Sequence, residues 1–357
     1  MEKYIFVLGR DPELSKDELY CYLDSRRIKY KVIEENDIVI ILEVHSIKSK
    51  EMIKALGGIQ KIAKVINNID NLYHGKENKL RYAVSCYSDE DVSDLKSQLK
   101  NYFKKEKLKA SIKKSHFQVE YLMPSEAQNV LEIIVYKKYL GKTLAVFNPK
   151  EHKHRDINRP EQRPLHTISI RLAKIMLNLS EVNKGDTLLD PFCGIGTILQ
   201  EAMIMGVNVV GIDNEVWCVE ASKKNLEWIK KEYNTDVKYT ILKGSATNLR
   251  NYVQTVDCAV TEPYLGPFLK KLPTEGTAKR TLIELAPMYS KLIDGLGKVV
   301  RKKAVIISPI FRTRSKMELG ITTLERDFKK AGFKFNEPYI YTASKSKMLR
   351  QIWVLTK

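Results

Sequence analysis

The chain has 357 residues, of which 43% are hydrophobic and 29% charged, a balance typical of globular rather than disordered or fibrous proteins. Lys and Arg number 61 against 43 Asp and Glu, and the resulting net charge of +18 favours a polyanionic partner without indicating a fold. No apolar run approaches the ~20 residues that span a bilayer, and the N-terminus lacks a secretory signal, so a cytoplasmic protein is expected.

The five cysteines are widely spaced and include no Cys-x-x-Cys pair. This spacing argues against zinc ribbons and thioredoxin-type redox centres, and it predicts reduced thiols. His152, His154 and His166 have no cysteine or carboxylate at metal-ligand spacing. We expect these histidines to be solvated or structural, and we expect no metal site.

The basic excess is concentrated in two blocks. Residues 101–150 hold 10 Lys and Arg against 4 Asp and Glu, and residues 301–357 hold 14 against 4. Residues 151–300 are close to neutral, with 20 against 18. Two basic blocks on either side of a balanced middle are more typical of a footprint for a long anion than of scattered solubilising charge. We therefore expect a nucleic acid to lie across both blocks.

Short apolar runs alternate with amphipathic or polar segments through the first 150 residues. Strands are expected at residues 4–9, 37–44, 59–66, 80–87, 110–117, 131–136 and 143–147, and helices at 15–26, 47–56, 91–103 and from 125 onward. The first helix is expected to begin at Ser15, because Ser15-Lys-Asp-Glu18 has the spacing of a capping box. The alternation predicts two small α+β units, over residues 1–66 and 67–150.

A polar segment with three prolines, residues 148–164, lacks apolar periodicity and is expected to hold the linker, at 151–164. After it, strands are expected at residues 187–189, 207–212, 237–242, 258–260, 304–308, 334–341 and 351–355, and helices at 171–180, 197–205, 216–233, 278–295 and 319–331. Strands that alternate with helices predict a parallel, doubly wound sheet over residues 165–357.

A glycine-rich turn, Leu188-Leu-Asp-Pro-Phe-Cys-Gly-Ile-Gly-Thr-Ile198, lies between a predicted strand and a predicted helix. Gly194 and Gly196 let the backbone pass close to a ligand, and Asp213 ends the next strand, where a carboxylate can accept hydrogen bonds from ribose hydroxyls. Leu199 holds the third-glycine position of a pyrophosphate site, which favours a ligand with one ribose, such as S-adenosylmethionine. The alternative is a tight turn with a helix-capping aspartate.

A second cluster, Glu262-Pro263-Tyr264, follows the fourth strand of this half. Methylation of an exocyclic amine needs hydrogen-bond acceptors on its two protons, and one acceptor can take a proton as the new bond forms. The Glu262 side chain and a backbone carbonyl directed by the proline can serve as these acceptors, while Tyr264 offers a face for stacking the base. The alternative is an acidic loop at a strand end.

These motifs are similar to those of class I S-adenosylmethionine-dependent methyltransferases that act on amino groups. Asp190-Pro-Phe-Cys-Gly-Ile-Gly-Thr197 resembles the Asp-Pro-Phe-Cys-Gly-Ser-Gly-Thr motif of THUMP-domain RNA methyltransferases, and residues 163–180 resemble their entry helix. Phe6-Val-Leu-Gly-Arg-Asp-Pro-Glu-Leu-Ser15 and Ala55-Leu-Gly-Gly-Ile-Gln-Lys-Ile-Ala-Lys64 resemble the N-terminal region of the tRNA guanosine N2-methyltransferases that modify position 10. The resemblance covers nearly the whole chain.

The resemblance implies an α/β chain with a C-terminal Rossmann-like class I methyltransferase domain (165–357), an N-terminal α+β ferredoxin-like domain (1–66) and a THUMP RNA-binding domain (67–150) that grips the acceptor stem of tRNA. It implies catalysis by Glu262, Pro263 and Tyr264. The S-adenosyl-L-methionine donor would be bound by Thr167, Asp190, Phe192, Gly194, Gly196, Thr197, Asp213, Asn214, Ser245 and Ala246. A monomer is expected, and the need for a small activating subunit is left open.

Two departures from the family pattern stand out. The acceptor motif Asp-Pro-Pro-Tyr-Gly is here Glu262-Pro-Tyr-Leu-Gly266, which adds one methylene to the acid and moves the aromatic residue. The usual Gly-Asp-Ala after the third strand is Gly244-Ser-Ala246, so Ser245 replaces the acidic contact to the adenine amino group.

Three functions stay open from the sequence. The first is methylation of N2 of a guanosine in tRNA at position 10, once or twice. The second is methylation of an amine at another RNA site or at N6 of adenine in DNA, although no helix-turn-helix signal is present. The third is tRNA binding without catalysis, against which the intact donor residues argue.

Overall fold

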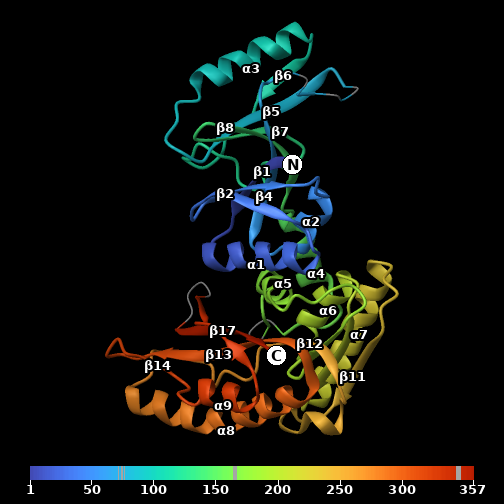
Figure 1. Cartoon of the computed structure of the whole chain (residues 1–357), viewed down its shortest axis with the longest axis vertical. Coiled ribbons are helices and arrows are strands. Elements are labelled where there is room, and N and C mark those ends of the chain that lie inside the picture. Colours follow the sequence, from blue (N-terminus) through green and yellow to red (C-terminus); the bar gives the residue numbers. More distant parts are fainter. Residues whose placement is uncertain (71, 74, 76, 164–166, 343–346) are drawn as a thin grey trace. The chain divides into compact units, whose positions relative to one another are not determined.

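The computed structural model describes residues 1–70, 72–73, 75, 77–163, 167–342 and 347–357. The chain divides into two compact units, Met1–Lys153 and His154–Lys357, each built around one sheet (Figure 1). In the part of the chain so described, no helix combines the length and the apolar character that crossing a membrane requires.

The first unit contains an eight-stranded sheet with the order β2-β3-β1-β4-β8-β7-β5-β6. Its strands are β1 (Glu2–Leu8), β2 (Tyr30–Glu35), β3 (Val39–Val44), β4 (Ile59–Ile66), β5 (Lys79–Cys86), β6 (Lys109–Ile112), β7 (Leu131–Tyr136) and β8 (Tyr139–Val146). Its helices are α1 (Pro12–Ser25), α2 (Ser49–Ala55) and α3 (Ser93–Lys105), and α4 (Pro149–Asn158) begins at its end.

Two apolar clusters cover this sheet. Leu19 and Leu23 of α1 pack with Phe6 of β1 and Ile40 of β3 in one cluster, to which α2 also contributes. Leu99 and Phe103 of α3 form the second cluster with side chains of β5 and β7. Each helix therefore buries one apolar face against the strands that precede or follow it in the chain, as the helical periodicity predicts.

A fully buried ion pair lies where the two halves of the sheet meet. The halves join through the antiparallel pairing of β4 with β8. Lys61 of β4 contacts the carboxylate of Glu132 on β7, and both side chains are fully buried. Lys61 also donates to the carbonyl of Leu122 at 2.6 Å, and Glu132 accepts from Thr143 at 3.0 Å and from Ser85. The expected units 1–66 and 67–150 thus share one sheet, and a domain boundary between them stays a prediction.

The start of α1 differs from the capping-box prediction. The helix begins at Pro12, with Asp11 at the N-cap, so Ser15 lies inside it and donates to the carbonyl of Asp11 at 2.7 Å. Proline is well suited to the first helical position, because its fixed φ matches the helix and its missing N–H is not needed there. Glu18 instead accepts from the backbone N–H groups of Gly57 and Gly58, each at 2.6 Å.

The first unit also differs from two further secondary-structure predictions. Strand β2 was missed, because its sequence YKVIEE has no apolar alternation and it lies at the sheet edge. Residues after Ser125 form turns rather than a helix, and the Glu126 carboxylate accepts from the N–H groups of His116 and Met123. Residues 149–158 of the polar segment form α4, whose buried Arg155 pairs with Glu201 through bonds of 2.7 and 3.0 Å, and the linker at 151–164 stays a prediction.

The second unit contains a nine-stranded sheet with the main order β11-β10-β9-β12-β13-β17-β15. Its strands are β9 (Thr187–Asp190), β10 (Asn208–Asp213), β11 (Tyr239–Lys243), β12 (Val256–Thr261), β13 (Val300–Arg312), β14 (Glu318–Gly320), β15 (Lys334–Phe335), β16 (Tyr339–Tyr341) and β17 (Met348–Thr356). Its helices are α5 (Ile170–Leu179), α6 (Thr197–Ile204), α7 (Val216–Glu232), the 3₁₀ helix η1 (Ala246–Asn251), α8 (Glu275–Val299) and α9 (Leu324–Lys330).

The expectation of a parallel, doubly wound sheet is correct for one side of this sheet. Strands β11, β10, β9, β12 and β13 are parallel, whereas β17 runs antiparallel to β13 and β15. Helices α5 and α6 lie on one face of the sheet, and α8 and α9 on the other (Figure 1). Because the parallel strands share a direction, the loops after their carboxyl ends meet at one edge, which is where open α/β sheets bind ligands.

The buried pair in the first unit leads to a stability prediction. Lys61→Met leaves the Glu132 carboxylate buried without its cation and is expected to lower the free energy of unfolding by about 3–5 kcal/mol. Lys61→Met/Glu132→Gln removes both charges, keeps an acceptor for one of the Ser85 and Thr143 hydroxyls and can donate to the other, so it should recover most of that loss. Urea denaturation measures both variants, with Lys48→Met of the exposed Lys48–Glu51 pair as control. Equal stability of wild type and Lys61→Met would contradict the role of the pair.

Candidate functional site

The turn between β9 and α6 has the backbone conformation that its glycines permit. Gly194 and Gly196 have φ angles of +51° and +85°, in the left-handed region that side chains disfavour. A Cβ at Gly196 would lie 2.6 Å from the Ser222 hydroxyl on α7, so this glycine allows close helix packing. A Cβ at Gly194 would meet no atom within 4 Å. Gly194 therefore faces open space into which a ligand can approach the backbone.

Asp213, at the end of β10, is tied to this turn. Its two carboxylate oxygens accept from the N–H of Gly194 and the N–H of Glu215, each at 2.9 Å. Its own carbonyl accepts from the N–H of Gly244, also at 2.9 Å. Since an ionised carboxylate has about four acceptor positions, two are left for the hydroxyls of a ribose. The position predicted for ribose binding is thus held firmly and can still accept hydrogen bonds.

Asp190, at the end of β9, is only 1% exposed. One of its oxygens accepts from the Thr261 hydroxyl at 2.8 Å and from the N–H of Phe192 at 3.1 Å. Burial raises the pKa of Asp190 to about 7, and the nearby negative charges of Asp213 and Glu262 raise it further, against the hydrogen bonds, which lower it. This buried side chain therefore joins the backbone of the turn at Phe192 to the end of β12 at Thr261.

Three carboxylates thus lie at the ends of three neighbouring strands. Strand β9 lies between β10 and β12, with Gly211 opposite Asp190 on one side and Ala259 opposite Leu189 on the other. Asp213 ends β10, Asp190 ends β9, and Glu262 immediately follows β12. The sheet therefore brings together residues that lie up to 72 positions apart in the chain.

Glu262 has a partner that the sequence analysis missed. The Arg350 Nε on β17 donates to Glu262 Oε1 at 2.5 Å, and both side chains are mostly buried. Pro263 is buried, while the side chain of Tyr264 is 54% exposed beside it. The buried hydroxyl of Tyr289 donates to the backbone carbonyls of Ile307 and Tyr264, at 3.2 and 3.5 Å. The three predicted catalytic residues therefore occupy an anchored loop with one exposed aromatic face.

The other residues predicted to bind the methyl donor differ in whether their side chains already make hydrogen bonds within the protein. Ser245 caps η1 by accepting from the N–H of Thr247, and Ala246 behind it is buried. The Thr197 hydroxyl accepts from the Arg159 guanidinium at 3.0 Å, and the Thr167 hydroxyl donates to the carbonyl of Arg163 at 2.6 Å. These two threonine side chains are already engaged within the protein.

Phe192 is half-buried against the core under β9, and Asn214 is exposed beside Asp213. His166 and Pro164 lie outside the described residues. All five cysteines are free, and the described ranges hold no cluster of three or more potential metal ligands. His154 contacts Glu232 at 2.9 Å on the surface, which agrees with a structural histidine.

The sequence analysis missed two further features of the site. Thr261, the last residue of β12, holds Asp190, and its place directly before Glu262 was a usable signal. Phe268 lies on the loop after Tyr264 with 66% of its side chain exposed. The backbone of this loop is held by Arg314, which donates to the carbonyl of Leu272 at 3.0 Å.

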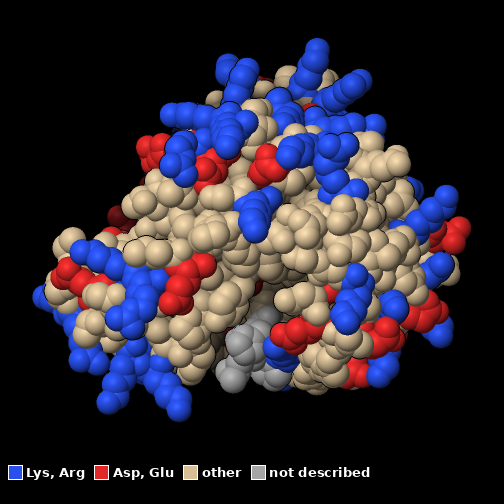
Figure 2. Space-filling model, turned by 90° about the horizontal axis from the view of Figure 1, so that it is seen from below, with Lys and Arg blue, Asp and Glu red and all other residues tan. Residues whose placement is uncertain are grey.

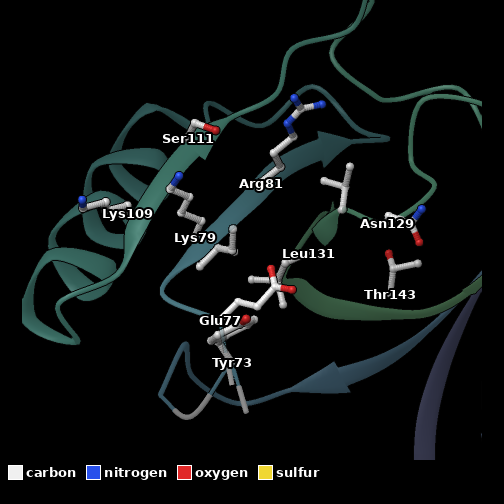
Figure 3. A pocket seen from close by; sticks show the side chains of 11 residues that line it. Tyr73, Glu77, Lys79, Arg81, Lys109, Ser111, Asn129, Leu131 and Thr143 are labelled. Carbon is white, nitrogen blue, oxygen red and sulfur yellow. The ribbon is translucent and has the colours of Figure 1, made fainter. Parts of the chain in front are cut away.

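A basic pocket of about 700 Å³ lies on the sheet of the first unit (Figure 3). Lys79 on β5 is opposite Lys109 on the parallel strand β6, and Arg81 is opposite Ser111. Because side chains alternate along a strand, these four residues share one face of the two strands. The full lining consists of Tyr73, Glu77, Lys79, Leu80, Arg81, Lys109, Ser111, Asn129, Val130, Leu131 and Thr143.

The basic block 301–357 and the basic pocket of the first unit differ in how their charge is used. Lys and Arg predominate over Asp and Glu on the face in Figure 2. In the block 301–357, however, many cations pair within the unit, namely Arg301 with Asp257, Lys302 with Asp186, Lys303 with Glu181, Arg312 with Glu318, Arg326 with Asp327 and Arg350 with Glu262. Lys79, Arg81 and Lys109 have no ion pair within the described ranges. The expected footprint over both blocks stays a prediction, and the first unit offers the more open cations.

Asp190 leads to a prediction on pH. Its pKa in the folded protein lies above that of aspartate in an unfolded chain, so its contribution to stability is complete below about pH 4 and is lost as the pH rises through about 7. Asp190→Asn stays neutral and keeps the acceptor for Thr261. Between pH 4 and pH 8, the free energy of unfolding should fall by about 4 kcal/mol more in the wild type than in this variant. Urea titrations without donor measure this difference, and Asp294→Asn, at an exposed pair, is the control. Parallel pH curves for wild type and Asp190→Asn would contradict the burial argument.

Two protein-family models match different, overlapping parts of the chain. An RMKL-like methyltransferase domain matches residues 159–318, which include the turn, Asp213 and Glu262. A DNA methylase model matches residues 27–224. The solved structure of TrmN from Thermus thermophilus is similar over 99% of both chains, with a TM-score of 0.55 and 14% identity, which supports the α/β fold with two mixed sheets.

Curated proteins of similar sequence indicate a more specific family than the domain models do. The tRNA (guanine(10)-N2)-dimethyltransferase of Methanothermobacter thermautotrophicus is 30% identical over 315 residues, covering 83% of this chain and 87% of the relative. The enzyme of the same name from Pyrococcus abyssi is 25% identical over 317 residues, covering 86% and 88%. The resemblance inferred from the motifs is thereby confirmed, and the chain belongs to the tRNA (guanine(10)-N2)-dimethyltransferase family of class I methyltransferases.

Proposed function

We propose that this chain transfers methyl groups from S-adenosyl-L-methionine to the exocyclic N2 amine of guanosine 10 in tRNA, and that it proceeds to the dimethylated base. The observation that carries the chemistry is the placement of Asp213, Asp190 and Glu262 at the ends of three neighbouring strands. Family membership supports the substrate and the second methylation, since the relatives are named dimethyltransferases.

The residues of the turn fit the donor. When bound, S-adenosyl-L-methionine supplies an activated methyl group on a sulfonium. The open space at Gly194 leaves room for the donor against the backbone, and Asp213 retains acceptor positions for its ribose hydroxyls. Asn214, Ser245 and Ala246 follow the ends of β10 and β11 and would border the adenine, while Thr197 and Thr167 would contribute through their backbones. Asp190 and Phe192 would support the turn from below.

The acceptor residues would orient the guanine amine. Glu262 would accept one N2 proton with its free carboxylate oxygen, and the backbone carbonyl at the Glu262–Pro263 step would accept the other. These bonds turn the nitrogen lone pair out of the ring and toward the methyl group, and the proton released on transfer would pass to the carboxylate or to water. Tyr264 would stack on the base with its exposed face.

The first unit would bind the tRNA. Its basic pocket, with Lys79, Arg81 and Lys109 on one sheet face, suits phosphate contacts that position an RNA without reading its sequence. We infer that residues 1–66 form the ferredoxin-like domain, residues 67–150 the THUMP domain, residues 151–164 the connection and residues 165–357 the Rossmann-like domain. A chain that acts as a monomer in the cytoplasm is part of this proposal.

The activity is tested by incubating unmodified tRNA with isotopically labelled donor and identifying the labelled nucleosides by mass spectrometry. N2-methylguanosine followed by N2,N2-dimethylguanosine, mapped to position 10, is the expected result. The DNA methylase match makes N6-methyladenine in DNA the second candidate, so duplex DNA is assayed in parallel. Label in adenine would overturn the proposal, and tight tRNA binding without any label would indicate a binding protein.

Removal of the Glu262 carboxylate gives the sharpest prediction for catalysis. Glu262→Gln is expected to lower kcat by roughly 10²–10⁴-fold, the range of a general acid–base contribution, while leaving the Kd for the donor unchanged. Single-turnover methylation and calorimetric donor binding measure the two effects. Glu318→Gln, which removes a carboxylate from an exposed ion pair in the same unit, is the matched control. Wild-type kcat in Glu262→Gln would refute the catalytic assignment.

The basic pocket gives a prediction for tRNA binding. Lys79→Ala/Lys109→Ala should weaken tRNA binding and reduce the slope of log K against log salt by about 0.7–0.9 for each phosphate that a lysine no longer neutralises. Donor affinity should not change. Lys31→Ala/Lys50→Ala, at exposed positions elsewhere in the unit, is the control of equal charge. Equal weakening in both double variants would show that only net charge matters.

A further inference from the structure

The contact between Glu262 and Arg350 joins the end of β12 to a residue on the last strand, 88 positions later. Arg350 Nε donates to Glu262 Oε1 at 2.5 Å. The exposed fractions of the two side chains are 14% for Glu262 and 19% for Arg350, so the pair is largely shielded from water. In the described part of the chain, no other group hydrogen-bonds to this carboxylate. Its second oxygen, Oε2, is therefore left for a substrate.

Arg350 has a firmly held backbone. Strand β17 pairs with β13 on one side, where Arg350 is opposite Pro309, and with β16 on the other side, where it is opposite Tyr341. A residue in the middle of three paired strands has little freedom to move its Cα. The guanidinium is consequently presented to Glu262 from a rigid element, which is the arrangement that orients a functional group most accurately.

Glu262 needs such a restraint because of its length. A glutamate side chain has three rotatable bonds, and without a partner it would sample several rotamers at the end of the strand. A hydrogen bond from a charged donor is stronger and more directional than one from a neutral donor. Fixing Oε1 on Arg350 restricts the rotamers of the side chain and so fixes the position of Oε2, whose lone pairs can accept from a substrate.

We propose that Arg350 is a positioning residue for the methyl transfer: by holding Oε1, it aims Oε2 of Glu262 at the amine of the acceptor base. This inference deepens the proposed function and rests on the role given there to Glu262. Arg350 itself does not bind the nucleic acid, because its side chain is mostly buried and committed to the carboxylate.

The proposal is tested by a double-mutant cycle on the full chain. Arg350→Met is expected to lower kcat for tRNA methylation by about 10²-fold, the cost of misplacing a reacting group by about 1 Å, with KM for tRNA and for the donor unchanged. Arg350→Lys keeps the charge and should recover part of the loss. Glu262→Gln/Arg350→Met should be no slower than Glu262→Gln alone, because Arg350 acts only through Glu262.

Measurements of donor affinity and circular dichroism test whether each variant is folded. Arg350→Met leaves a mostly buried carboxylate unpaired, so if it fails to fold, the Arg350→Lys variant and the double variant, which have no unpaired charge, carry the test. Wild-type kcat in Arg350→Lys and Arg350→Met, or multiplicative losses in the double variant, would overturn the positioning role.

The same cycle separates this inference from the proposed function. Full activity of Glu262→Gln would remove the catalytic assignment itself. A severe loss in Glu262→Gln together with wild-type activity in the Arg350 variants would leave the proposed function intact and would overturn only the role of Arg350. A higher KM for tRNA with unchanged kcat in Arg350→Met would assign Arg350 to RNA binding, which is contrary to the proposal.

Discussion

The second unit depends on one constraint: three parallel strands must end in carboxylates at adjacent positions without those charges disrupting the sheet edge. Asp213, Asp190 and Glu262 meet this constraint in three different ways. Asp213 is satisfied by two backbone N–H groups, Asp190 by the Thr261 hydroxyl and the N–H of Phe192, with a pKa that burial raises toward the neutral form, and Glu262 by a guanidinium. Because each carboxylate has different hydrogen-bond partners, the three side chains can lie close together and still differ in the acceptor positions that they leave for a ligand. Under the proposed function, Asp213 would offer hydrogen-bond acceptors to ribose hydroxyls, and Glu262 would offer one free oxygen to the amine.

The residues of the turn after β9 determine how closely a ligand can approach the sheet. Gly196 lets α7 approach, a Cβ at Gly194 would meet no atom within 4 Å, and the buried Asp190 accepts from the N–H of Phe192 in the turn. A ligand placed there would meet backbone rather than flexible side chains, so its position is set by the sheet itself. The acceptor loop is fixed from a different direction, by Tyr289 and Arg350, which belong to α8 and β17. Under the proposed function, one sheet would therefore hold both the residues for the methyl donor and those for the acceptor base.

Much of this site could be predicted from the sequence, because its signals are local. The glycines of the turn, Asp213 at a strand end and the strands β4 and β7 all follow from patterns within about ten residues. The predictions that failed depend instead on contacts between residues far apart in the chain. The Ser15 capping box was wrong because Pro12 starts the helix earlier and Glu18 bonds to Gly57 and Gly58, some 40 residues away. Helix α4 was missed because buried Arg155 depends on Glu201, and Arg350 was missed because its partner lies 88 positions earlier. Polar contacts across long sequence distances leave no periodic pattern.

Net charge is also a poor guide to binding, because it does not show which cations are already paired with carboxylates. The C-terminal block 301–357 is strongly basic in sequence, yet many of its cations neutralise carboxylates of their own unit, and one of these cations holds the proposed catalytic group. A cation that is already paired with a carboxylate gains little from a phosphate, because it would have to give up its present partner. Lys79, Arg81 and Lys109 lie side by side with no such partner in the described ranges, so they repel one another until an anion arrives. The surface that attracts a polyanion is therefore identified by unpaired cations on one face, and a count of basic residues along the chain is a poor substitute for it.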